Sequence, residues 1–152
     1  MKTEIEYGIG PHLMLDCYGC PKDKLADMDF IFNLLDTFPQ KIKATKIMAP
    51  YVFKYHGQTP DDWGLSGVVL IAESHISIHT FPDKGNAFVD IFSRKEFDTD
   101  FARETLLQEF SATHHEVVLL NRGVEFPKNM SRAADFVNQE RLDLVGSHRV
   151  YH

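Results

Sequence analysis

The apolar positions of this chain change their period several times, and each change marks an expected element of structure. Alternating or continuous apolar runs predict strands at residues 11–18, 41–53, 65–72, 74–80, 86–92 and 114–121. Apolar residues recur every three or four positions over 22–38 and 99–112, which predicts two amphipathic helices. Strands and helices therefore alternate over most of the chain.

Proline and capping residues set the expected boundaries of these elements. Pro39 is expected to end the first helix, and Asp98 or Thr99 to cap the second. Because Pro50 lacks a backbone N–H, the strand over 41–53 is expected at a sheet edge or with a bulge. The remaining segments are expected to form a loop at 54–64, a turn at 82–85 and a short helix at 131–142.

The grouping of strands around two helices predicts an α+β fold, a two-layer α/β sandwich with an antiparallel sheet and two main helices on one face. One domain over residues 1–152 is expected, with 123–152 as a C-terminal extension of lower core content. A single helical layer leaves the second face of the sheet open. A second copy of the chain is therefore expected to cover it in a homodimer.

Composition excludes several classes of protein. The chain has 152 residues, of which 43% are hydrophobic, and 12 of them are Phe, which is typical of a globular core rather than of disorder. A net charge of −6 without any basic run argues against a nucleic-acid partner. Apolar stretches fall short of the roughly 18 residues that span a membrane, and the first residues lack the apolar part of a signal peptide. A cytoplasmic protein without a membrane partner is expected.

Cys17 and Cys20 are the only cysteines and form a Cys-x-x-Cys motif. Such a motif serves redox chemistry or supplies half of a zinc site, but no second ligand pair stands at a suitable spacing. Because Cys17 falls in an apolar strand, both cysteines are expected to be buried and structural. His114 and His115 point to opposite faces of a strand, so no metal site is expected.

The stretch from Glu73 to His79 concentrates a carboxylate, two hydroxyls and two imidazoles within a predicted strand. In an alternating strand, Ser74 shares one face with Ile76 and Ile78, whereas His75 and His79 lie on the other. One interpretation is a strand whose polar groups all find partners. The other is a serine nucleophile activated by a nearby base, although no Gly-x-Ser-x-Gly motif or assembled triad supports a hydrolase.

The segment 64–82 (GLSGVVLIAESHISIHTFP), followed by Gly85 and the run 89–92 (VDIF), closely resembles the prokaryotic S-adenosylmethionine decarboxylase proenzymes. The segment 12–20 (HLMLDCYGC) is similar to the first strand and turn of that family. The resemblance covers about residues 10–122, and its Glu-Ser-His-x-Ser-x-His-Thr core is highly specific. The residues beyond about 123 are not accounted for.

This resemblance implies an enzyme that makes its own pyruvoyl cofactor from Ser74. In the family, the serine hydroxyl attacks the preceding carbonyl, here that of Glu73, and elimination of the resulting ester splits the chain between residues 73 and 74. His79 and Ser66 lie at the positions that assist this processing. The pyruvoyl carbonyl then forms a Schiff base with the substrate amine and accepts electrons as carbon dioxide leaves. The family fold implies an αββα dimer with sites at or near the interface.

The chain departs from the family after the strand at 86–92. The family has a proton-donating cysteine after a Phe-Thr pair, whereas this sequence reads Phe92-Ser93-Arg94. Arginine is a poor proton donor because its pKa stays above about 12. Two other groups are candidates for proton donation: Ser93, which is able only to relay a proton, and His75, because imidazole titrates near neutral pH.

A second departure lies in the loop before Ser66. The family has an aromatic residue that stacks on adenine where this chain has Pro60. Trp63 is a candidate to stack from a shifted position. Asp61 and Asp62 are candidates to bind a guanidinium or an ammonium group, which suits arginine or ornithine. An ordinary solvated loop explains the two carboxylates equally well.

Three functions therefore compete at this point. The first is S-adenosylmethionine decarboxylase of spermidine and polyamine biosynthesis, which the overall resemblance favours. The second is the same pyruvoyl chemistry on L-arginine or L-ornithine, which the acidic loop motivates. The third is an unprocessed, non-catalytic regulatory homologue, which the missing cysteine motivates. A small-molecule substrate is implied by the first two.

Overall fold

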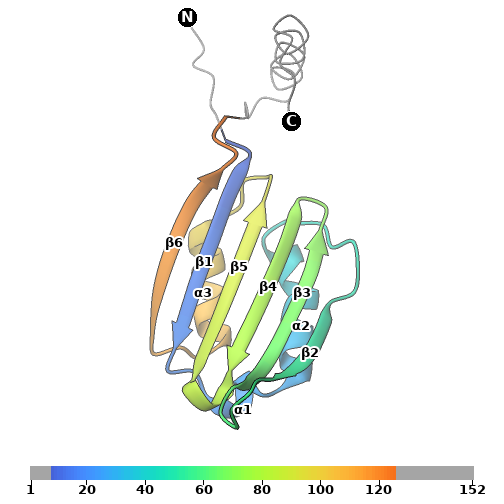
Figure 1. Cartoon of the computed structure of the whole chain (residues 1–152). Helices are drawn as coiled ribbons and strands as arrows, with labels where there is room; N and C mark the ends of the chain where they lie inside the picture. Colours follow the sequence, from blue (N-terminus) through green and yellow to red (C-terminus); the bar gives the residue numbers. More distant parts are fainter. Residues whose placement is uncertain (1–7, 126–152) are drawn as a thin grey trace, which may run out of the picture. The chain divides into compact units, whose positions relative to one another are not determined.

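The computed structural model describes residues 8–125, and its strands form a six-stranded sheet of order β2-β3-β4-β5-β1-β6 (Figure 1). The strands are β1 (Gly10–Tyr18), β2 (Tyr51–His56), β3 (Trp63–Ile71), β4 (Ser74–Phe81), β5 (Asn86–Ser93) and β6 (His114–Arg122). The helices are α1 (Lys22–Leu25), α2 (Met28–Lys41), the 3₁₀ turn η1 (Pro82–Lys84) and α3 (Thr99–Glu109).

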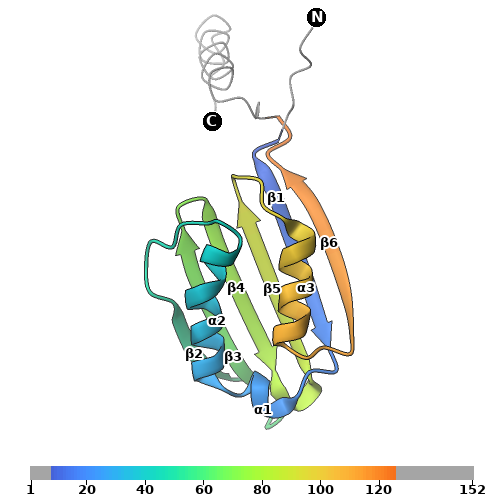
Figure 2. The ribbon, with the colours of Figure 1, turned by 180° about the vertical axis from the view of Figure 1, so that it is seen from behind.

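The sheet and its helices form two layers. β2, β3, β4 and β5 follow one another as antiparallel neighbours, and β1 pairs antiparallel with β5. Figure 2 shows α2 and α3 side by side on the same face of the sheet. The α+β two-layer fold predicted from the sequence is thereby confirmed. The opposite face of the sheet has no helix over it within residues 8–125.

The core lies between the sheet and the two long helices. Strand residues that point toward the helices are almost fully buried, and burial of each large aliphatic side chain stabilises the fold by about 1.5–3 kcal/mol. Gly67 lets α2 approach β3 closely, because a Cβ at this position would lie 2.7 Å from the Cδ1 of Leu35. The largest fully buried aliphatic side chains are Leu13, Leu15, Leu25, Ile31, Leu35, Leu65, Ile76, Ile78, Ile91 and Leu106.

The first helix begins at residue 22 as predicted, but it is interrupted and ends later than predicted. The helix expected over 22–38 is divided into α1 and α2, because the side chain of Asp27 accepts a hydrogen bond from Phe30 N (3.1 Å) and starts a new helix. Pro39 lies inside the last turn of α2 and does not end it. A proline removes only one N–H from the hydrogen-bond ladder, and so near a C-terminus the helix continues for two more residues.

The strand expected over 41–53 is also shifted. β2 begins only at Tyr51, directly after Pro50, and continues to His56. Before it, the segment forms no strand and pairs with β3 through an isolated bridge between Lys46 and Ile71. β2 is nevertheless an edge strand, as the proline predicted. The loop predicted at 54–64 is correspondingly shorter.

The other predicted elements are confirmed within a few residues. Asp98 caps α3 by accepting from Phe101 N (2.9 Å), although the helix ends at Glu109 rather than at 112. Gly85 closes the turn after η1 with a left-handed φ of 70°. The short helix predicted at 131–142 lies outside the described residues.

By its contacts, the chain divides into two compact units. The larger comprises residues 11–120, and the smaller contains the described residues 8–10 and 121–125. Within the smaller unit, Ile9 N donates to Arg122 O (2.6 Å). The single domain over 1–152 stays a prediction. Among the described residues, no helix is both long and apolar enough to cross a bilayer.

Candidate active site

β4 carries three of the residues singled out in the sequence, Ser74, His75 and His79. Ser74 is its first residue and follows a two-residue turn, Ala72-Glu73, that joins it to β3. Ile76 and Ile78 are buried against the helices. His75 and His79 therefore project from the opposite, open face, as the predicted alternation requires.

The Ser74 end of β4 brings a hydroxyl and an imidazole together. The Oγ of Ser74 lies 3.1 Å from Nδ1 of His75. The Glu73 side chain is turned away from this pair, since its Oε2 accepts a hydrogen bond from Thr45 N (3.1 Å). The carboxylate thus anchors the turn, while the Glu73 carbonyl belongs to the peptide bond that joins it to Ser74.

Arg94 holds this turn from the end of β5. Its backbone N donates to Glu73 O (3.0 Å), and its Nε donates to the same oxygen (3.2 Å). Its Nη2 donates to Ala72 O (2.7 Å). Two successive carbonyls of the turn therefore accept hydrogen bonds from one exposed arginine.

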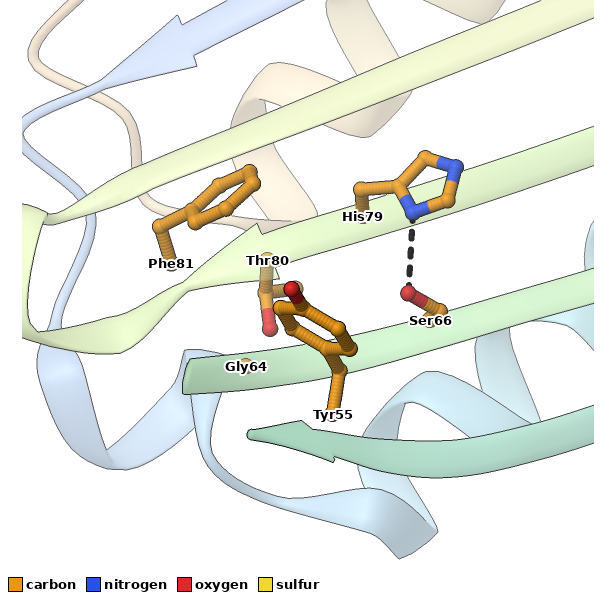
Figure 3. A pocket seen from close by; sticks show the side chains of 6 residues that line it. All are labelled: Tyr55, Gly64, Ser66, His79, Thr80 and Phe81. Atoms are coloured by element: carbon orange, nitrogen blue, oxygen red, sulfur yellow. Dashed lines mark hydrogen bonds between the residues drawn. The ribbon is translucent and has the colours of Figure 1, made fainter. Parts of the chain in front are cut away.

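The other end of β4 holds a second hydroxyl–imidazole pair. Ser66 of β3 and His79 of β4 stand directly opposite each other, and Oγ of Ser66 lies 2.9 Å from Nδ1 of His79 (Figure 3). The pair lines a pocket of about 230 Å³, whose walls include the rings of Tyr55 and Phe81. The pocket is lined by Tyr55, Gly64, Ser66, His79, Thr80 and Phe81.

The floor of this pocket depends on close packing between β3 and β4. Gly64 is required because a Cβ at this position would overlap the carbonyl oxygen of Thr80. The buried Thr80 hydroxyl accepts from Leu65 N (3.0 Å) and donates to Leu25 O (2.8 Å). Thr80 thus links the β3–β4 pair to α1. Because its hydroxyl is used in these two bonds, the neighbouring His79 is the side chain of this part of β4 that is available for chemistry.

The structure brings Ser66 and His79 together but does not bring Ser74 to them within one chain. His79 lies five residues along β4 from Ser74, which is about 16 Å in an extended strand. By the alternation of the strand, Ser74 and His79 also belong to opposite faces of the sheet. The predicted processing residues therefore lie in two separate places, Ser74 beside His75 and Ser66 beside His79.

The predicted substrate-binding loop does not reach the pocket. Trp63 and Ser66 belong to opposite faces of β3, and the Trp63 Nε1 donates to Asp83 Oδ2 (2.8 Å). Asp61 Oδ1 accepts from the Thr59 hydroxyl (2.8 Å), a bond that holds the pKa of the Asp61 carboxyl below its ordinary value. Asp62 is half-buried and is likewise absent from the pocket lining.

Ser93, a candidate for proton relay, lies directly across from Ser74 in the β4–β5 pair. Its side chain is buried, and its hydroxyl donates to Lys95 O (2.7 Å) and accepts from Lys95 N (3.0 Å). These bonds occupy the hydroxyl proton in a local turn. Of the two candidates for proton donation, His75 is the one in contact with Ser74.

Sequence reasoning missed the aromatic walls of the pocket. Tyr55 was assigned to a loop, but it lies in β2 opposite Gly64. The signal was present, because Tyr51, Phe53 and Tyr55 alternate with the period of a strand. In the sequence, Phe81 stands out only as part of the segment 64–82 that resembles the family.

The cysteines are buried, as predicted. Cys17 points into the core, and burial raises the pKa of its thiol from 9.0 to about 12, with smaller contributions from Cys20 and Asp16. Burial also raises the pKa of Cys20. A thiol that stays protonated suits a structural position.

Comparisons with known proteins agree with this architecture. Residues 11–123 match the sequence pattern of the family described as S-adenosylmethionine decarboxylase. The S-adenosylmethionine decarboxylase proenzyme of Pyrococcus furiosus is 33% identical over 136 residues, covering 89% of this chain and 94% of that protein. The proenzyme of Thermodesulfovibrio yellowstonii is 33% identical over 140 residues, covering 91% and 98%. The crystal structure of the adenosylmethionine decarboxylase from Aquifex aeolicus superposes with a TM-score of 0.62 at 29% identity, covering 80% of this chain and 94% of that one.

The fold and the two hydroxyl–imidazole pairs define the class: a two-layer α+β protein built like the Aquifex aeolicus decarboxylase. The chain belongs to the S-adenosylmethionine decarboxylase family. The resemblance stated from the sequence is thereby confirmed, and the matched residues agree with the expected extent.

Proposed function

We propose that this chain is a pyruvoyl-dependent S-adenosylmethionine decarboxylase of polyamine biosynthesis, and that it forms its cofactor by cutting itself between Glu73 and Ser74. The observation that carries the proposal is the position of Ser74. It opens β4 after a tight turn, and its hydroxyl contacts the imidazole of His75. Membership of the decarboxylase family supplies the substrate class.

The proposed maturation uses the atoms of the turn and one water molecule. The Ser74 Oγ adds to the Glu73 carbonyl carbon, the C–N bond breaks, and the amide becomes an ester with a free α-amine on Ser74. Loss of the Ser74 α-proton then breaks the Cβ–Oγ bond and releases Glu73 as a carboxylate. The resulting dehydroalanine takes up water and loses ammonia, which leaves a pyruvoyl group at the start of the fragment 74–152.

The residues around Ser74 fit such a group. Ser74 starts an ordered strand, so cleavage leaves the new terminus held by the pairing of β4 with β3 and β5. When formed, the pyruvoyl carbonyl would supply an electron sink for the loss of carbon dioxide from an amine substrate. His75, in contact with the Ser74 side chain, is placed to return the proton that this reaction requires.

The pocket beside Ser66 and His79 is proposed to hold the adenosyl part of the substrate. Tyr55 and Phe81 offer aromatic surfaces on either side, which suit a flat heterocycle. A volume of about 230 Å³ is below the roughly 300–1,000 Å³ of most small-molecule sites. One chain is therefore proposed to contribute only part of the site.

We propose that a homodimer completes it. Ser74 and His79 are too far apart to cooperate within one β4. Ser74 is the first residue of β4, and we propose that the Ser66–His79 pair of a second copy, packed on the open face, reaches it at this end of the strand. The open face also exposes the apolar rings of β2, which a partner would cover. The exposed rings are Tyr51 (62%), Phe53 (44%) and Tyr55 (47%).

The decisive experiment is the intact mass of the purified chain under denaturing conditions after incubation at neutral pH. We expect two fragments separated between residues 73 and 74, with a pyruvoyl terminus on the second, while a Ser74→Ala chain stays whole. A wild-type chain of 17.4 kDa that remains uncut would instead support the regulatory alternative.

A substrate panel then tests the activity. Release of carbon dioxide is expected from S-adenosylmethionine, with L-arginine and L-ornithine as the comparison substrates. Turnover of either amino acid without turnover of S-adenosylmethionine would overturn the substrate assignment but leave the maturation intact. The structure offers the amino-acid alternative no pocket contact from Asp61 or Asp62.

A further inference from the structure

Arg94 stands where the family has a cysteine, and its contacts converge on the bond that is proposed to break. The Glu73 carbonyl oxygen accepts from both the backbone N (3.0 Å) and the side-chain Nε (3.2 Å) of Arg94. The Nη2 of the same guanidinium donates to Ala72 O (2.7 Å), which fixes the plane of the fork. Two N–H donors from one residue therefore point at one carbonyl oxygen.

This arrangement is that of an oxyanion-binding site. When the Ser74 Oγ adds to the Glu73 carbonyl carbon, the carbonyl π electrons move onto the oxygen and give it a negative charge. The contact of the guanidinium with this oxygen strengthens as the charge grows, because the interaction of a cation with a neutral carbonyl becomes one between two opposite charges. Because this gain arises only as the charge develops, it lowers the barrier rather than merely stabilising the uncut chain.

We propose that the Arg94 guanidinium, together with the Arg94 backbone N–H, stabilises the oxyanion formed at Glu73 during self-cleavage. The inference rests on the proposed maturation and assigns a catalytic residue for it. Position 94, where the family has a cysteine, thus acts in this chain through its positive charge and not as a proton donor, because a guanidinium keeps its protons at physiological pH. The proton chemistry then falls to other groups.

The step balances without any external reactant. The Ser74 hydroxyl proton passes to Nδ1 of His75, 3.1 Å away, as the Oγ–C bond forms and the carbonyl electrons move to oxygen. Those electrons then return, the C–N bond breaks, and the proton passes from the imidazole to the leaving nitrogen. The product is the ester of Glu73 with Ser74.

Arg94 is also placed to favour the elimination that follows. Breaking the Cβ–Oγ bond of Ser74 releases the α-carboxylate of Glu73, so the oxygen already bound by Arg94 becomes part of an anion. A guanidinium fork binds carboxylates strongly. The contact that stabilises the oxyanion therefore also stabilises the leaving group.

The test follows cleavage of newly synthesised full-length chain by cell-free translation and denaturing mass spectrometry. Arg94→Met removes the guanidinium but keeps the backbone N–H, and we expect cleavage to slow by roughly 10- to 100-fold, below the ~1,000-fold upper range for buried oxyanion donors because Arg94 is exposed. Arg94→Lys, which keeps the positive charge but not the planar guanidinium, should cleave at a rate between those of the wild type and Arg94→Met. Lys95→Met is the matched control and should cleave at the wild-type rate.

Two further measurements separate catalysis from folding. Guanidinium or methylguanidinium at millimolar concentration should partly restore cleavage of Arg94→Ala but not of Ser74→Ala. In the uncleavable Ser74→Ala background, adding Arg94→Met should leave the far-ultraviolet circular dichroism spectrum unchanged.

The outcomes distinguish this inference from the proposed function. A wild-type chain that never cuts would overturn both together. A wild type that cuts while Arg94→Met cuts equally fast would overturn the role of Arg94 alone. Slow cleavage of Arg94→Met would also overturn it, in favour of a structural role, if guanidinium fails to rescue Arg94→Ala or if Arg94→Met alters the spectrum in the Ser74→Ala background.

Discussion

The two ends of β4 carry similar groups in different settings. At the Ser74 end, a hydroxyl and an imidazole sit beside a turn whose backbone is held from both sides. Thr45 accepts from Ala72 N (2.8 Å) and donates to the Glu73 carboxylate, while Arg94 binds the two carbonyls. At the other end, the exposed His79 pairs with Ser66 in an open aromatic pocket.

The contrast follows from what each end is proposed to do. Chemistry on the backbone requires a fixed peptide, because a mobile turn would not hold the hydroxyl and the carbonyl carbon in register. A pocket for a substrate must stay open until the substrate and a partner chain close it. The end held by hydrogen bonds is thus the one proposed to react, and the open end is the one proposed to bind the substrate.

The largest expected effect tests whether the two ends of β4 work independently of each other. We expect His79→Ala to slow self-cleavage by about 100- to 1,000-fold, because the His79 imidazole of the partner chain is proposed to take the Ser74 α-proton in the elimination, and a positioned imidazole contributes this much to proton transfer. Co-expression with Ser74→Ala should restore cleavage of the His79→Ala chain, since the partner then supplies the intact imidazole. Denaturing mass distinguishes the chains, because only one of them retains Ser74.

The matched control for this rescue is co-expression with a Ser74→Ala, His79→Ala double variant, which offers neither group. Rescue by the single variant but not by the double variant would fix His79 as a group supplied across the interface. If His79→Ala stays uncut with both partners, the homodimeric site is wrong and His79 acts only within its own chain.

Most of the sheet could be predicted from the sequence because β3, β4 and β5 are long, apolar and bounded by clear turns. The helix boundaries were less predictable, since a buried apolar stripe continues across the break at Asp27 while the cap is a single hydrogen bond. Likewise, Pro39 is predicted to stop the first helix, but α2 continues for two more residues before it ends.

The candidate site was predictable in its residues but not in its grouping. The motif indicated Ser66, Ser74 and His79, but not that Ser74 lies apart from the other two. This separation depends on strand register and on the rise of about 3.3 Å per residue, which apply only once β4 is known to be continuous. Arg94 appeared in the sequence only as a missing cysteine. Its contacts with the β3–β4 turn arise from the pairing of β5 with β4, which no local pattern reveals.

A smaller effect sharpens the role of the open end. Tyr55→Leu removes an aromatic wall of the pocket, and we expect KM for S-adenosylmethionine to rise about 2- to 13-fold, equivalent to a stacking contribution of about 0.5–1.5 kcal/mol. Self-cleavage should be unchanged, because Tyr55 has no proposed part in the proton transfers at Ser74 and leucine keeps an apolar side chain on the face that a partner would cover. Tyr51→Leu, on the same face of β2 but outside the pocket, is the control; an equal rise in KM there would mean that Tyr55 acts through the sheet and not through the pocket.

The smallest effect on function is expected on the helix-covered face, which belongs to neither end. Burial raises the pKa of Cys17 to about 12, so at pH 8 only about one thiol in 10,000 is ionised, against about one in ten for an ordinary thiol at 9.0. Iodoacetamide at pH 8 should therefore leave Cys17 of the folded chain unlabelled and the rate of self-cleavage unchanged, whereas labelling should be rapid in urea. Raising the pH to 9 should speed labelling of the folded chain about tenfold, because the thiolate fraction rises by that factor below the pKa. Rapid labelling of the folded chain at pH 8 would show that the core opens between the helices α2 and α3 and the sheet. The turn at Ser74 would then be held in place by its own hydrogen bonds alone.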